Sequence, residues 1–372
     1  MRPKVTRAAL LREFGAPLEL AEVPLPDELP PGSAIVRVRT TTLCGTDAHL
    51  WQGAMPFVAL PIVLGHEMVG EIVALGPYAG QDALGAPVEI GSRVVWSESV
   101  CGHCHGCAVL REPVLCANRG YGFSQRADRW PFVIGGLSEY AYLPPGAHRV
   151  VVADDMPDTW AASAGCAVKT VVRAFANAGG VDPGATVVVQ GSGPLGLVAT
   201  ALARAGGAGQ VITLGGPSGR LRMATAFGAD TIIDVTAVTD SDERVAMVEE
   251  LTGARGADLV IDVAGGPTVN REGVLMCAQR GTHVVVGLAG PGAAAVPMDV
   301  VMSRELRVVG SLNGDVGDLV RALRLLTGLA DRFAWDALFS DPVGLADADS
   351  ALKDMATMAA VKAVVDPRME IS

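Results

Sequence analysis

The chain has 372 residues, half of them apolar, and a formal net charge of −11 at pH 7. No unbroken apolar run reaches the roughly 18 residues that a membrane-spanning helix requires, and the negative charge without a Lys/Arg block disfavours nucleic acid as a partner. The N-terminal stretch lacks the apolar run of a secretory signal, so we expect a cytoplasmic protein, and the length predicts two domains.

Up to about residue 165 the chain reads as short β runs separated by Pro- and Gly-rich breaks, for example AIVRVRT at 34–40 and MVGEIVALG at 68–76. Runs of this kind predict a β-rich domain with irregular loops. Six of the seven cysteines lie in or next to this region, whereas Cys277, in the apolar run VLMCAQ, is expected to be an ordinary buried thiol.

Four cysteines crowd one loop of the β-rich region. Cys101, Cys104 and Cys107 are each separated by two residues, and Cys116 follows after eight more. A disulfide framework is the alternative, but such frameworks stabilise small secreted domains, and this chain is long and has an odd number of cysteines. The spacing therefore favours a zinc site.

From about residue 168 the pattern changes to apolar strands that alternate with helical stretches, which predicts a parallel sheet covered on both faces. The first of these strands, ATVVVQG, runs directly into GSGPLG, and a helical stretch follows. In this context Gly191 allows a tight turn, Gly193 lets a pyrophosphate approach the backbone, and Gly196 lets helix and strand pack closely. We therefore expect a dinucleotide-binding unit.

The second strand ends at Leu214, where an acidic residue that binds the adenine ribose is expected. Gly215 takes that place instead. With Ser218 and Arg220 just beyond it, the phosphate of NADP could be accommodated; alternatively, Arg220 only lies on the solvent face of the helix that Pro217 begins. The cofactor is therefore NAD or NADP, with the choice open.

Five motifs follow one another along the chain: CGTDAH at 44–49, GHEMVGEIVALGPYA at 65–79, the cysteine cluster, GCAVKT at 165–170 and GSGPLG at 191–196. In order and spacing they resemble the zinc-dependent medium-chain alcohol dehydrogenases over nearly the whole chain. The resemblance implies an α/β protein with a GroES-like β-rich catalytic domain, residues 1–167 and 313–372, and a Rossmann doubly wound parallel-sheet domain, residues 168–312. It also implies an active site in the cleft between them.

The resemblance implies a catalytic zinc held by Cys44, His66 and Cys166, with a fourth position open to water or substrate. Glu67 matches a residue that coordinates zinc in some members of the family; its alternative role is that of a carboxylate next to the ligands. Asp47 matches the group that orients His66. Thiolates and an imidazole with one open position are also what a catalytic zinc site requires chemically.

The reaction implied is hydride transfer between an alcohol and the nicotinamide, with zinc acting as a Lewis acid. Thr46 corresponds to the hydroxyl that receives the proton and His49 to the residue that passes it to solvent. Leu195 and Thr170 correspond to residues on either side of the nicotinamide ring. Lys362 corresponds to a cation that pairs with the pyrophosphate, although it could also be a solvated surface lysine.

The cysteine cluster resembles the family's structural zinc lobe, so two zinc ions per chain are implied. The family usually has seven residues between the third and fourth cysteines, whereas this chain has eight. We expect the loop to absorb the extra residue; the alternatives are His103 or His105 as substitute ligands, or an empty site.

The substrate is expected to be an apolar or cyclic secondary alcohol or the matching ketone, because the neighbourhoods that form the family's pocket are aromatic. They include Trp51, Phe57, Trp96, Ser97, Tyr121 and Phe123. The competing functions are a zinc-independent quinone or enoyl reductase and an inactive dinucleotide-binding protein. Finally, the apolar strand at 304–312 should lie last in the sheet and be covered in a homodimer or homotetramer.

Overall fold

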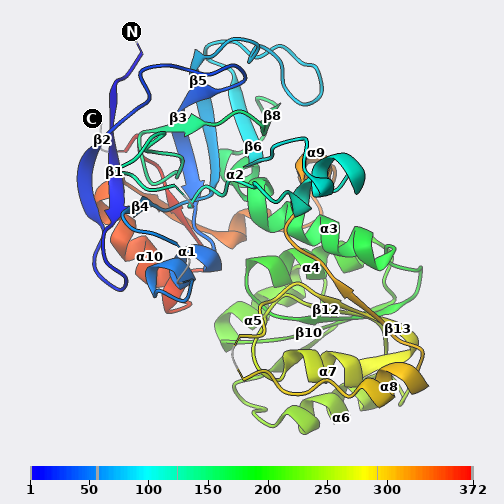
Figure 1. Ribbon diagram of the computed structural model, residues 1–372. Helices are drawn as coiled ribbons and strands as arrows, with labels where there is room; N and C mark the ends of the chain where they lie inside the picture. The colour runs from blue at the N-terminus through cyan, green and yellow to red at the C-terminus, as the bar shows by residue number, and fades with distance from the viewer. Residues whose placement is uncertain (1, 56–57, 124, 291, 370–372) are drawn as a thin grey trace. The chain divides into compact units, whose positions relative to one another are not determined.

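The computed structural model describes residues 2–55, 58–123, 125–290 and 292–369, which form two compact units (Figure 1). Unit 1 comprises residues 1–169, 314–328 and 335–372, and unit 2 comprises residues 170–313 and 329–334. The chain thus crosses between the units after Lys169 and after Asn313, where the sequence suggested crossings near 167 and 312.

Unit 1 is built on two sheets, one in the order β2-β1-β4 and the other in the order β15-β16-β3-β5-β6-β8, with β7 also paired to β3. The strands are β1 (Val5–Leu11), β2 (Glu19–Pro24), β3 (Ala34–Thr42), β4 (Ile62–Val63), β5 (Glu67–Leu75), β6 (Arg93–Ser99), β7 (Tyr140–Leu143), β8 (Ala147–Val151), β15 (Phe339–Val343) and β16 (Lys362–Val365). The helices are α1 (Gly45–Trp51), α2 (Asp158–Ser163), α9 (Val316–Gly328) and α10 (Ala348–Ala356).

Unit 2 is a parallel sheet in the order β11-β10-β9-β12-β13-β14. Its strands are β9 (Thr186–Gln190), β10 (Gln210–Gly215), β11 (Thr231–Asp234), β12 (Ala257–Asp262), β13 (Cys277–Val285) and β14 (Arg307–Gly310). Its helices are α3 (Lys169–Ala178, whose first residue belongs to unit 1), α4 (Pro194–Ala205), α5 (Ser218–Ala226), α6 (Ser241–Leu251), α7 (Val269–Met276) and α8 (Met298–Ser303).

The strand order of unit 2 reverses between β9 and β12, as in a doubly wound sheet. Figure 1 shows α4 and α5 on one face of the sheet and α6 and α7 on the other. Because both faces are covered, every residue of β9 is buried, which explains the three valines at its centre. Cys277 lies in this core, fully buried, as expected of an ordinary thiol.

One short segment departs from the expected division. Residues 329–334 belong to unit 2, although the whole stretch after 313 was assigned to the catalytic domain. The reason is local packing: Phe333 stacks on Phe227, with ring centroids 6.4 Å apart, and Arg332 donates a hydrogen bond to the carbonyl of Arg204. Sequence pattern alone carries no signal for such a return of the chain.

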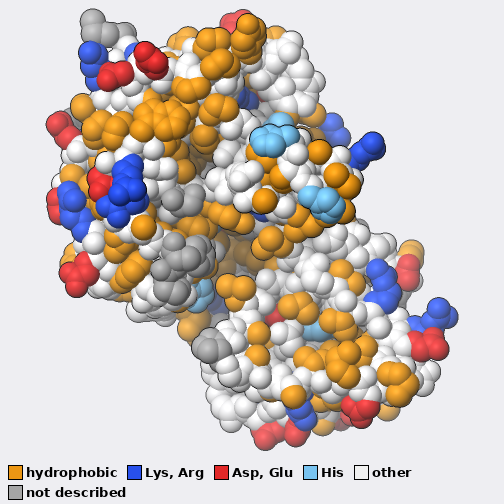
Figure 2. Space-filling model, in the orientation of Figure 1, with side chains coloured by type: hydrophobic (Ala, Val, Ile, Leu, Met, Phe, Trp, Pro, Cys, Tyr) orange, Lys and Arg blue, Asp and Glu red, His pale blue; other side chains and the backbone are white. Residues whose placement is uncertain are grey.

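In the described part of the chain, no helix has the length and apolar character needed to cross a membrane. On the face shown in Figure 2, acidic and basic side chains are scattered among apolar ones and do not gather into a block of one sign.

Candidate active site

Cys44 lies two residues after β3 and is the N-cap residue of α1, with 8% of its surface exposed. Its position is held by Asp47, whose Oδ2 accepts a hydrogen bond from the Cys44 amide at 2.9 Å. Thr46 lies in the first turn of α1, its hydroxyl 3.9 Å from Cys44 Sγ. The short helix thus presents a thiol, a hydroxyl and a carboxylate within one turn.

His66 lies between β4 and β5, and the same Asp47 side chain holds it. Oδ1 of Asp47 is 3.3 Å from Nδ1 of His66 and accepts a hydrogen bond from the Gly65 amide at 3.0 Å. Burial opposes protonation of His66, but the fully buried Asp47 carboxylate outweighs it and raises the pKa of His66. With Nδ1 engaged in this way, Nε2 remains for a metal.

Cys166 completes the set from a π-helical turn, Ala164–Val168, that joins α2 to α3. The ligand atoms of Cys44, His66, Glu67 and Cys166 all lie within 4.8 Å of one another. Contact between the two sulfur atoms lowers the pKa of Cys44 and raises the pKa of Cys166, so a metal that bound both as thiolates would have to displace the proton of Cys166. The residues therefore fit the zinc ion that the sequence predicted: two thiols and an imidazole around one point, with a carboxylate beside them.

Glu67 opens β5 and is fully buried. Its Oε2 accepts a hydrogen bond from the Thr42 hydroxyl at 2.5 Å and is paired with the ammonium of Lys362. Its Oε1 has no hydrogen-bond partner in the described residues, so one carboxylate oxygen remains for a metal. Both roles predicted for Glu67 are compatible with this placement.

Lys362 opens β16 and is 1% exposed, so the alternative of a solvated surface lysine is wrong. Its ammonium is also 3.5 Å from the carbonyl oxygen of Leu43. Because the charge is already paired with Glu67, contact with a pyrophosphate would require that pair to open. The role toward the dinucleotide therefore stays a prediction.

The two residues predicted to relay the proton lie on α1. Thr46 is half-buried, and His49, one turn further along, is exposed. Residues three apart on a helix share a face. The helix thus offers a path from beside Cys44 to solvent, and the relay itself stays a prediction.

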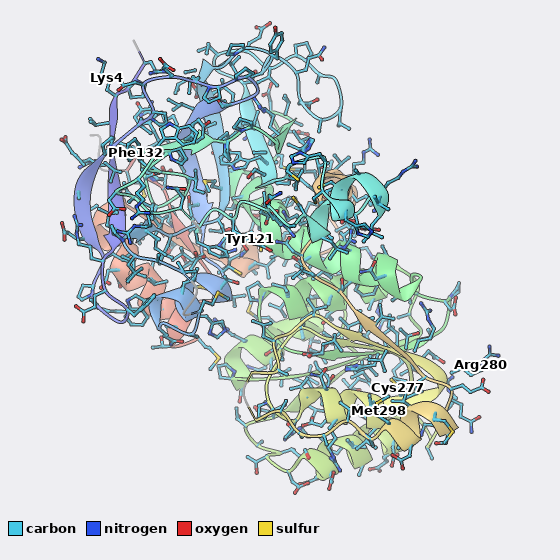
Figure 3. The ribbon with its side chains drawn as sticks, in the orientation of Figure 1. Lys4, Tyr121, Phe132, Cys277, Arg280 and Met298 are labelled. Atoms are coloured by element: carbon cyan, nitrogen blue, oxygen red, sulfur yellow. The ribbon has the colours of Figure 1, made fainter. Side chains whose placement is uncertain are left out.

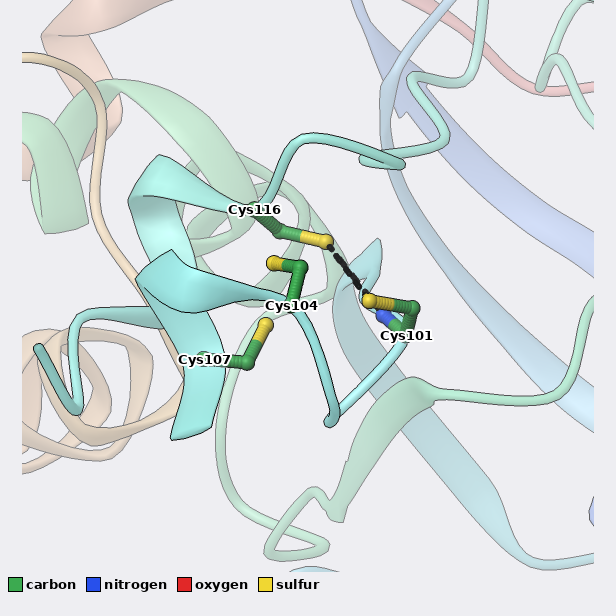
Figure 4. A group of neighbouring side chains, drawn as sticks. All are labelled: Cys101, Cys104, Cys107 and Cys116. Atoms are coloured by element: carbon green, nitrogen blue, oxygen red, sulfur yellow. Dashed lines mark hydrogen bonds between the residues drawn. The ribbon is translucent and has the colours of Figure 1, made fainter. Parts of the chain in front are cut away.

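The four clustered cysteines form what we call the cysteine lobe, residues 101–116. The sulfur atoms of Cys101, Cys104, Cys107 and Cys116 lie within 4.8 Å of one another (Figure 4), and all are free thiols. Cys116 Sγ is 3.6 Å from Cys101 Sγ and accepts hydrogen bonds from the amides of Cys101 and Asn118. Four converging thiols with no disulfide fit a closed zinc site.

The loop that carries the extra residue before Cys116 forms two tight turns, a π-helical turn over His105–Val109 and a 3-10 turn over Pro113–Leu115. A π-helical turn holds one residue more than an α-helical turn, so it accommodates an insertion locally. The side chains of His103 and His105 are exposed and lie outside the sulfur cluster. The geometry does not support either histidine as a substitute ligand.

The glycine turn of unit 2 joins β9 to α4. Gly191 has a φ of 129°, which favours glycine, and a Cβ at Gly196 would collide with the Gly191 carbonyl. Around Gly193, at the N-cap of α4, a Cβ would meet no atom within 4 Å. The turn therefore has the close packing and the open backbone that a pyrophosphate site requires.

Two residues are predicted to contact the nicotinamide ring. Leu195 is half-buried in the first turn of α4, and Thr170 is buried in α3. Their contacts with the nicotinamide stay predictions.

Gly215 ends β10, and a side chain there would collide with Ser192, which explains why no acidic residue occupies the position. A carboxylate nevertheless reaches this end of the sheet: Asp234, at the end of β11, is the register partner of Gly215. It accepts hydrogen bonds from the Ser218 hydroxyl and from the hydroxyl of Thr236, the latter at 2.6 Å. The sequence interpretation missed Asp234, whose place depends on strand register. Arg220 is half-buried, and burial lowers its pKa.

The aromatic residues expected near the substrate do not form one group. Tyr121, labelled in Figure 3, stacks on Phe123, and Phe123 meets the ring of His66 edge-on. Trp51 packs on the same apolar core, around β1 and α10, to which Phe123 and Tyr121 belong, whereas Trp96 packs on the core around β3, β5 and β6. Phe57 lies outside the described residues. A small hollow lies beside His66 and includes Trp96 and Ser97 in its lining.

Comparison with known proteins shows which family the chain belongs to. Residues 30–155 match the model of the alcohol dehydrogenase GroES-like domain, and residues 194–328 match that of the zinc-binding dehydrogenases. The chain is 35% identical to a 5-exo-hydroxycamphor dehydrogenase from Pseudomonas putida, over 97% of this chain and 98% of that protein. The chain belongs to the zinc-dependent medium-chain alcohol dehydrogenase family.

Solved structures of the family agree with the fold. An alcohol dehydrogenase from Thermotoga maritima has a TM-score of 0.88 at 30% identity and covers 97% of this chain and 99% of its own. A dehydrogenase from Sinorhizobium meliloti 1021 bound to NADP has a TM-score of 0.82 at 26% identity, over 98% of this chain and 100% of its own. The chain is therefore an NAD(P)-dependent alcohol or ketone oxidoreductase of the zinc-binding class, and the zinc-independent alternative is not favoured.

Proposed function

We propose that the protein interconverts an apolar, cyclic secondary alcohol and its ketone, with two zinc ions per chain and with NAD as the preferred cofactor. The observation that carries the proposal is the convergence of Cys44, His66 and Cys166 next to the Thr46 hydroxyl. An inactive binding protein would have no need to keep a hydroxyl and a complete ligand set together.

Zinc bound by Cys44, His66 and Cys166 would supply Lewis-acid polarisation of the substrate oxygen. The chain itself supplies the remaining groups. Asp47 fixes the orientation of His66 and of the loop that carries Cys44, and Thr46 accepts the proton of the alcohol. The exposed His49 then passes this proton to solvent. The cysteine lobe would hold the second zinc as a structural ion.

The substrate class follows from the apolar side of the site. Phe123 lies with its ring centroid 5.6 Å from that of His66, and Tyr121 extends the apolar surface behind it. Aromatic side chains favour binding of a substrate with a rigid carbon skeleton over binding of a polyol, because the hydroxyls of a polyol would need hydrogen-bond partners. The relative named for hydroxycamphor points the same way, because its substrate bears a hydroxyl on a bicyclic skeleton.

The preference for NAD rests on Asp234. Hydrogen bonds from Ser218 and Thr236 lower the pKa of Asp234 to about 2, so its carboxylate is anionic at neutral pH. A 2′-phosphate beside Gly215 would meet this negative charge, whereas a ribose hydroxyl could donate to it. Ser218, expected to favour a phosphate, has its hydroxyl engaged with the same carboxylate.

The assembly we propose is a homodimer or homotetramer that forms through β14. This strand lies at the edge of the sheet of unit 2, paired to β13 on one side. Val308 on β14 is exposed, as are Met302 and Met298 (Figure 3) on α8. An exposed apolar edge strand favours pairing with a second copy. We propose the cytoplasm as the location because seven free thiols persist best in a reducing compartment.

The decisive experiment is a panel of primary, cyclic secondary and polyhydric alcohols, with the matching ketones, run with NAD and NADP in parallel on protein of measured zinc content. We expect the highest kcat/KM with a cyclic secondary alcohol and NAD, at about two zinc ions per chain. A higher kcat/KM with a polyol would contradict the proposed substrate class. A higher kcat/KM with NADP would contradict the role proposed for Asp234. Zinc-free protein that reduces a quinone or an enone would overturn the proposal.

A further inference from the structure

We propose that Glu98 and Arg119 are positioning residues that transmit the order of the cysteine lobe to the catalytic metal ligands Cys166 and His66. The proposal rests on the function proposed above, because it assumes that both sites bind zinc. It is carried by a continuous series of contacts within unit 1, which starts at the two ends of the lobe and reaches the catalytic ligands by two routes.

The centre of the series is an ion cluster of Glu98, Arg119 and Lys169. Oε2 of Glu98 accepts from Lys169 Nζ at 2.6 Å and from Arg119 Nη2 at 2.9 Å. The side chains are between 0% and 10% exposed. Burial would raise the pKa of Glu98, but the two cations outweigh it and lower that pKa to about 2. Removing the carboxylate would leave two buried cations without their counter-charge, which would lower the stability of the folded protein.

The cluster closes the cysteine lobe. Glu98 precedes Cys101 by three residues and Arg119 follows Cys116 by three, so one ion pair joins the two ends of the loop. Arg119 Nη1 also donates to the carbonyl oxygen of Val114, inside the lobe, at 2.9 Å. A change in the lobe therefore shifts the guanidinium directly.

The first route leads to Cys166. Lys169 follows Cys166 by three residues where a π-helical turn passes into α3, so the two residues lie about one turn apart. Lys169 is fully buried and pairs with Glu98. Because its ammonium needs that carboxylate, the backbone turn that carries Cys166 is tied to Glu98.

The second route leads to His66 through aromatic rings. The guanidinium of Arg119 lies 5.1 Å from the ring centroid of Tyr121, which stacks on Phe123 with centroids 5.2 Å apart. Phe123 in turn meets His66 edge-on. A Cβ at Gly122 would lie 3.1 Å from that of His66, so this backbone packs directly against the ligand. Such contacts have preferred geometries and transmit a displacement of the guanidinium.

Without an ion, the four sulfur atoms lose the metal bonds that would hold them together, so an empty or mutated lobe would loosen the loop and, with it, Glu98 and Arg119. Residues that orient metal ligands change metal affinity by about 10- to 100-fold when replaced. The lobe would thus affect the catalytic metal without contributing an atom to it.

The test uses the zinc-loaded full-length protein and measures the release of each zinc ion to a chromogenic chelator. A Cys44→Ser variant identifies the catalytic phase because it removes that phase alone. We expect Glu98→Gln and Arg119→Met to accelerate the catalytic phase by about tenfold or more, and Arg119→Lys to restore it in part. Arg244→Met is the matched control, since it breaks the buried Arg244–Glu272 pair, at 2.6 Å, within unit 2. Arg244→Met should destabilise the protein about as much as Arg119→Met does, and it should leave the rate of catalytic zinc release unchanged.

A double-mutant cycle tests whether the effect of the cysteine lobe on the catalytic zinc passes through Arg119. Cys104→Ser, which opens the lobe, should accelerate catalytic zinc release in the wild-type background but add little in the Arg119→Met background. Fully additive effects would overturn the proposal, as would an unchanged catalytic phase in Glu98→Gln. If instead the wild-type protein shows no phase that Cys44→Ser removes, the proposed function itself fails, so the two failures are distinguishable.

Discussion

The ligands of the catalytic metal in unit 1 come from distant parts of the chain, from Cys44 to Cys166, whereas in unit 2 the glycines of the dinucleotide turn lie between 191 and 196. The first set needs the tertiary fold to bring it together, and buried ionic side chains surround it. The second is complete within one strand, one turn and one helix. A change at the first site should therefore impair the chemistry and spare dinucleotide binding.

Cys44→Ser is the sharpest way to test this division. A hydroxyl binds zinc more weakly than a thiolate, so we expect one zinc ion per chain to be lost and alcohol oxidation to fall by about a thousandfold or more. Dinucleotide affinity, followed by the fluorescence of bound reduced cofactor, should remain within about twofold because unit 2 is intact. Cys277→Ser is a control for loss of a thiol away from any site. Alcohol oxidation that survives in Cys44→Ser would refute the zinc mechanism.

Asp47→Asn should have the next largest effect. Asp47 is fully buried and holds the amides of Cys44 and Gly65 as well as His66. The amide side chain keeps the shape but loses the charge, and catalytic zinc affinity should fall by about 10- to 100-fold. Competition with a zinc buffer measures this, and added zinc should restore part of the activity. An unchanged affinity would mean that Asp47 organises only the backbone.

The catalytic site also shows which of its residues could be predicted from the sequence. Cys44, Asp47 and His66 lie in short motifs whose spacing is informative, and so do the glycines of unit 2. The pair of Lys362 with Glu67, by contrast, joins residues almost 300 positions apart, and nothing in either local sequence indicates the partner. Such pairs depend on which strands become neighbours, and strand pairing is decided by the packing of the whole unit.

Asp234 was missed for the same reason, since it reaches the dinucleotide end of the sheet only through the register of β11 against β10. Glu98, Lys169 and Arg119 are likewise ordinary charged residues in the sequence, and only the fold buries them together. Motifs thus indicate the groups that perform chemistry, whereas the groups that hold them in place become visible with the tertiary structure.

Unit 2 carries a titratable group whose effect should be on stability alone. His283 on β13 is fully buried, its Nε2 is 3.3 Å from Asn270 Oδ1, and burial lowers its pKa from 6.5 to about 4. Because the folded pKa lies below the unfolded one, the stabilisation is complete above about pH 6.5 and is lost as the pH falls toward 4.

At pH 5 this loss amounts to about 2 kcal/mol. His283→Gln, which keeps a polar group but does not titrate, should remove that part of the pH dependence. Hydrogen exchange of β13 peptides at pH 7 and pH 5, corrected for intrinsic rates, measures the difference between variant and wild type. If both lose the same protection at pH 5, His283 does not titrate as proposed. Zinc content should not change in either case.

The smallest effect that we predict concerns the choice of cofactor. Asp234→Asn removes the anionic charge beside Gly215. Its amide oxygen can still accept the hydrogen bond from Thr236, and its NH2 group can donate to the Ser218 hydroxyl in place of the second carboxylate oxygen. A phosphate of about two negative charges near one carboxylate is repelled by roughly 1–2 kcal/mol in water, less in salt. The ratio of kcat/KM for NADP over NAD should therefore rise by about tenfold.

Low ionic strength should enlarge this difference, because screening weakens the repulsion. The matched control is Asp230→Asn, which alters a carboxylate of the same unit that pairs with Arg204. It should leave the cofactor ratio unchanged. A ratio that is equally unaffected in Asp234→Asn would show that this carboxylate only anchors the turn around Ser218. Half-buried Arg220 in α5 would then be the next side chain to test for cofactor selection.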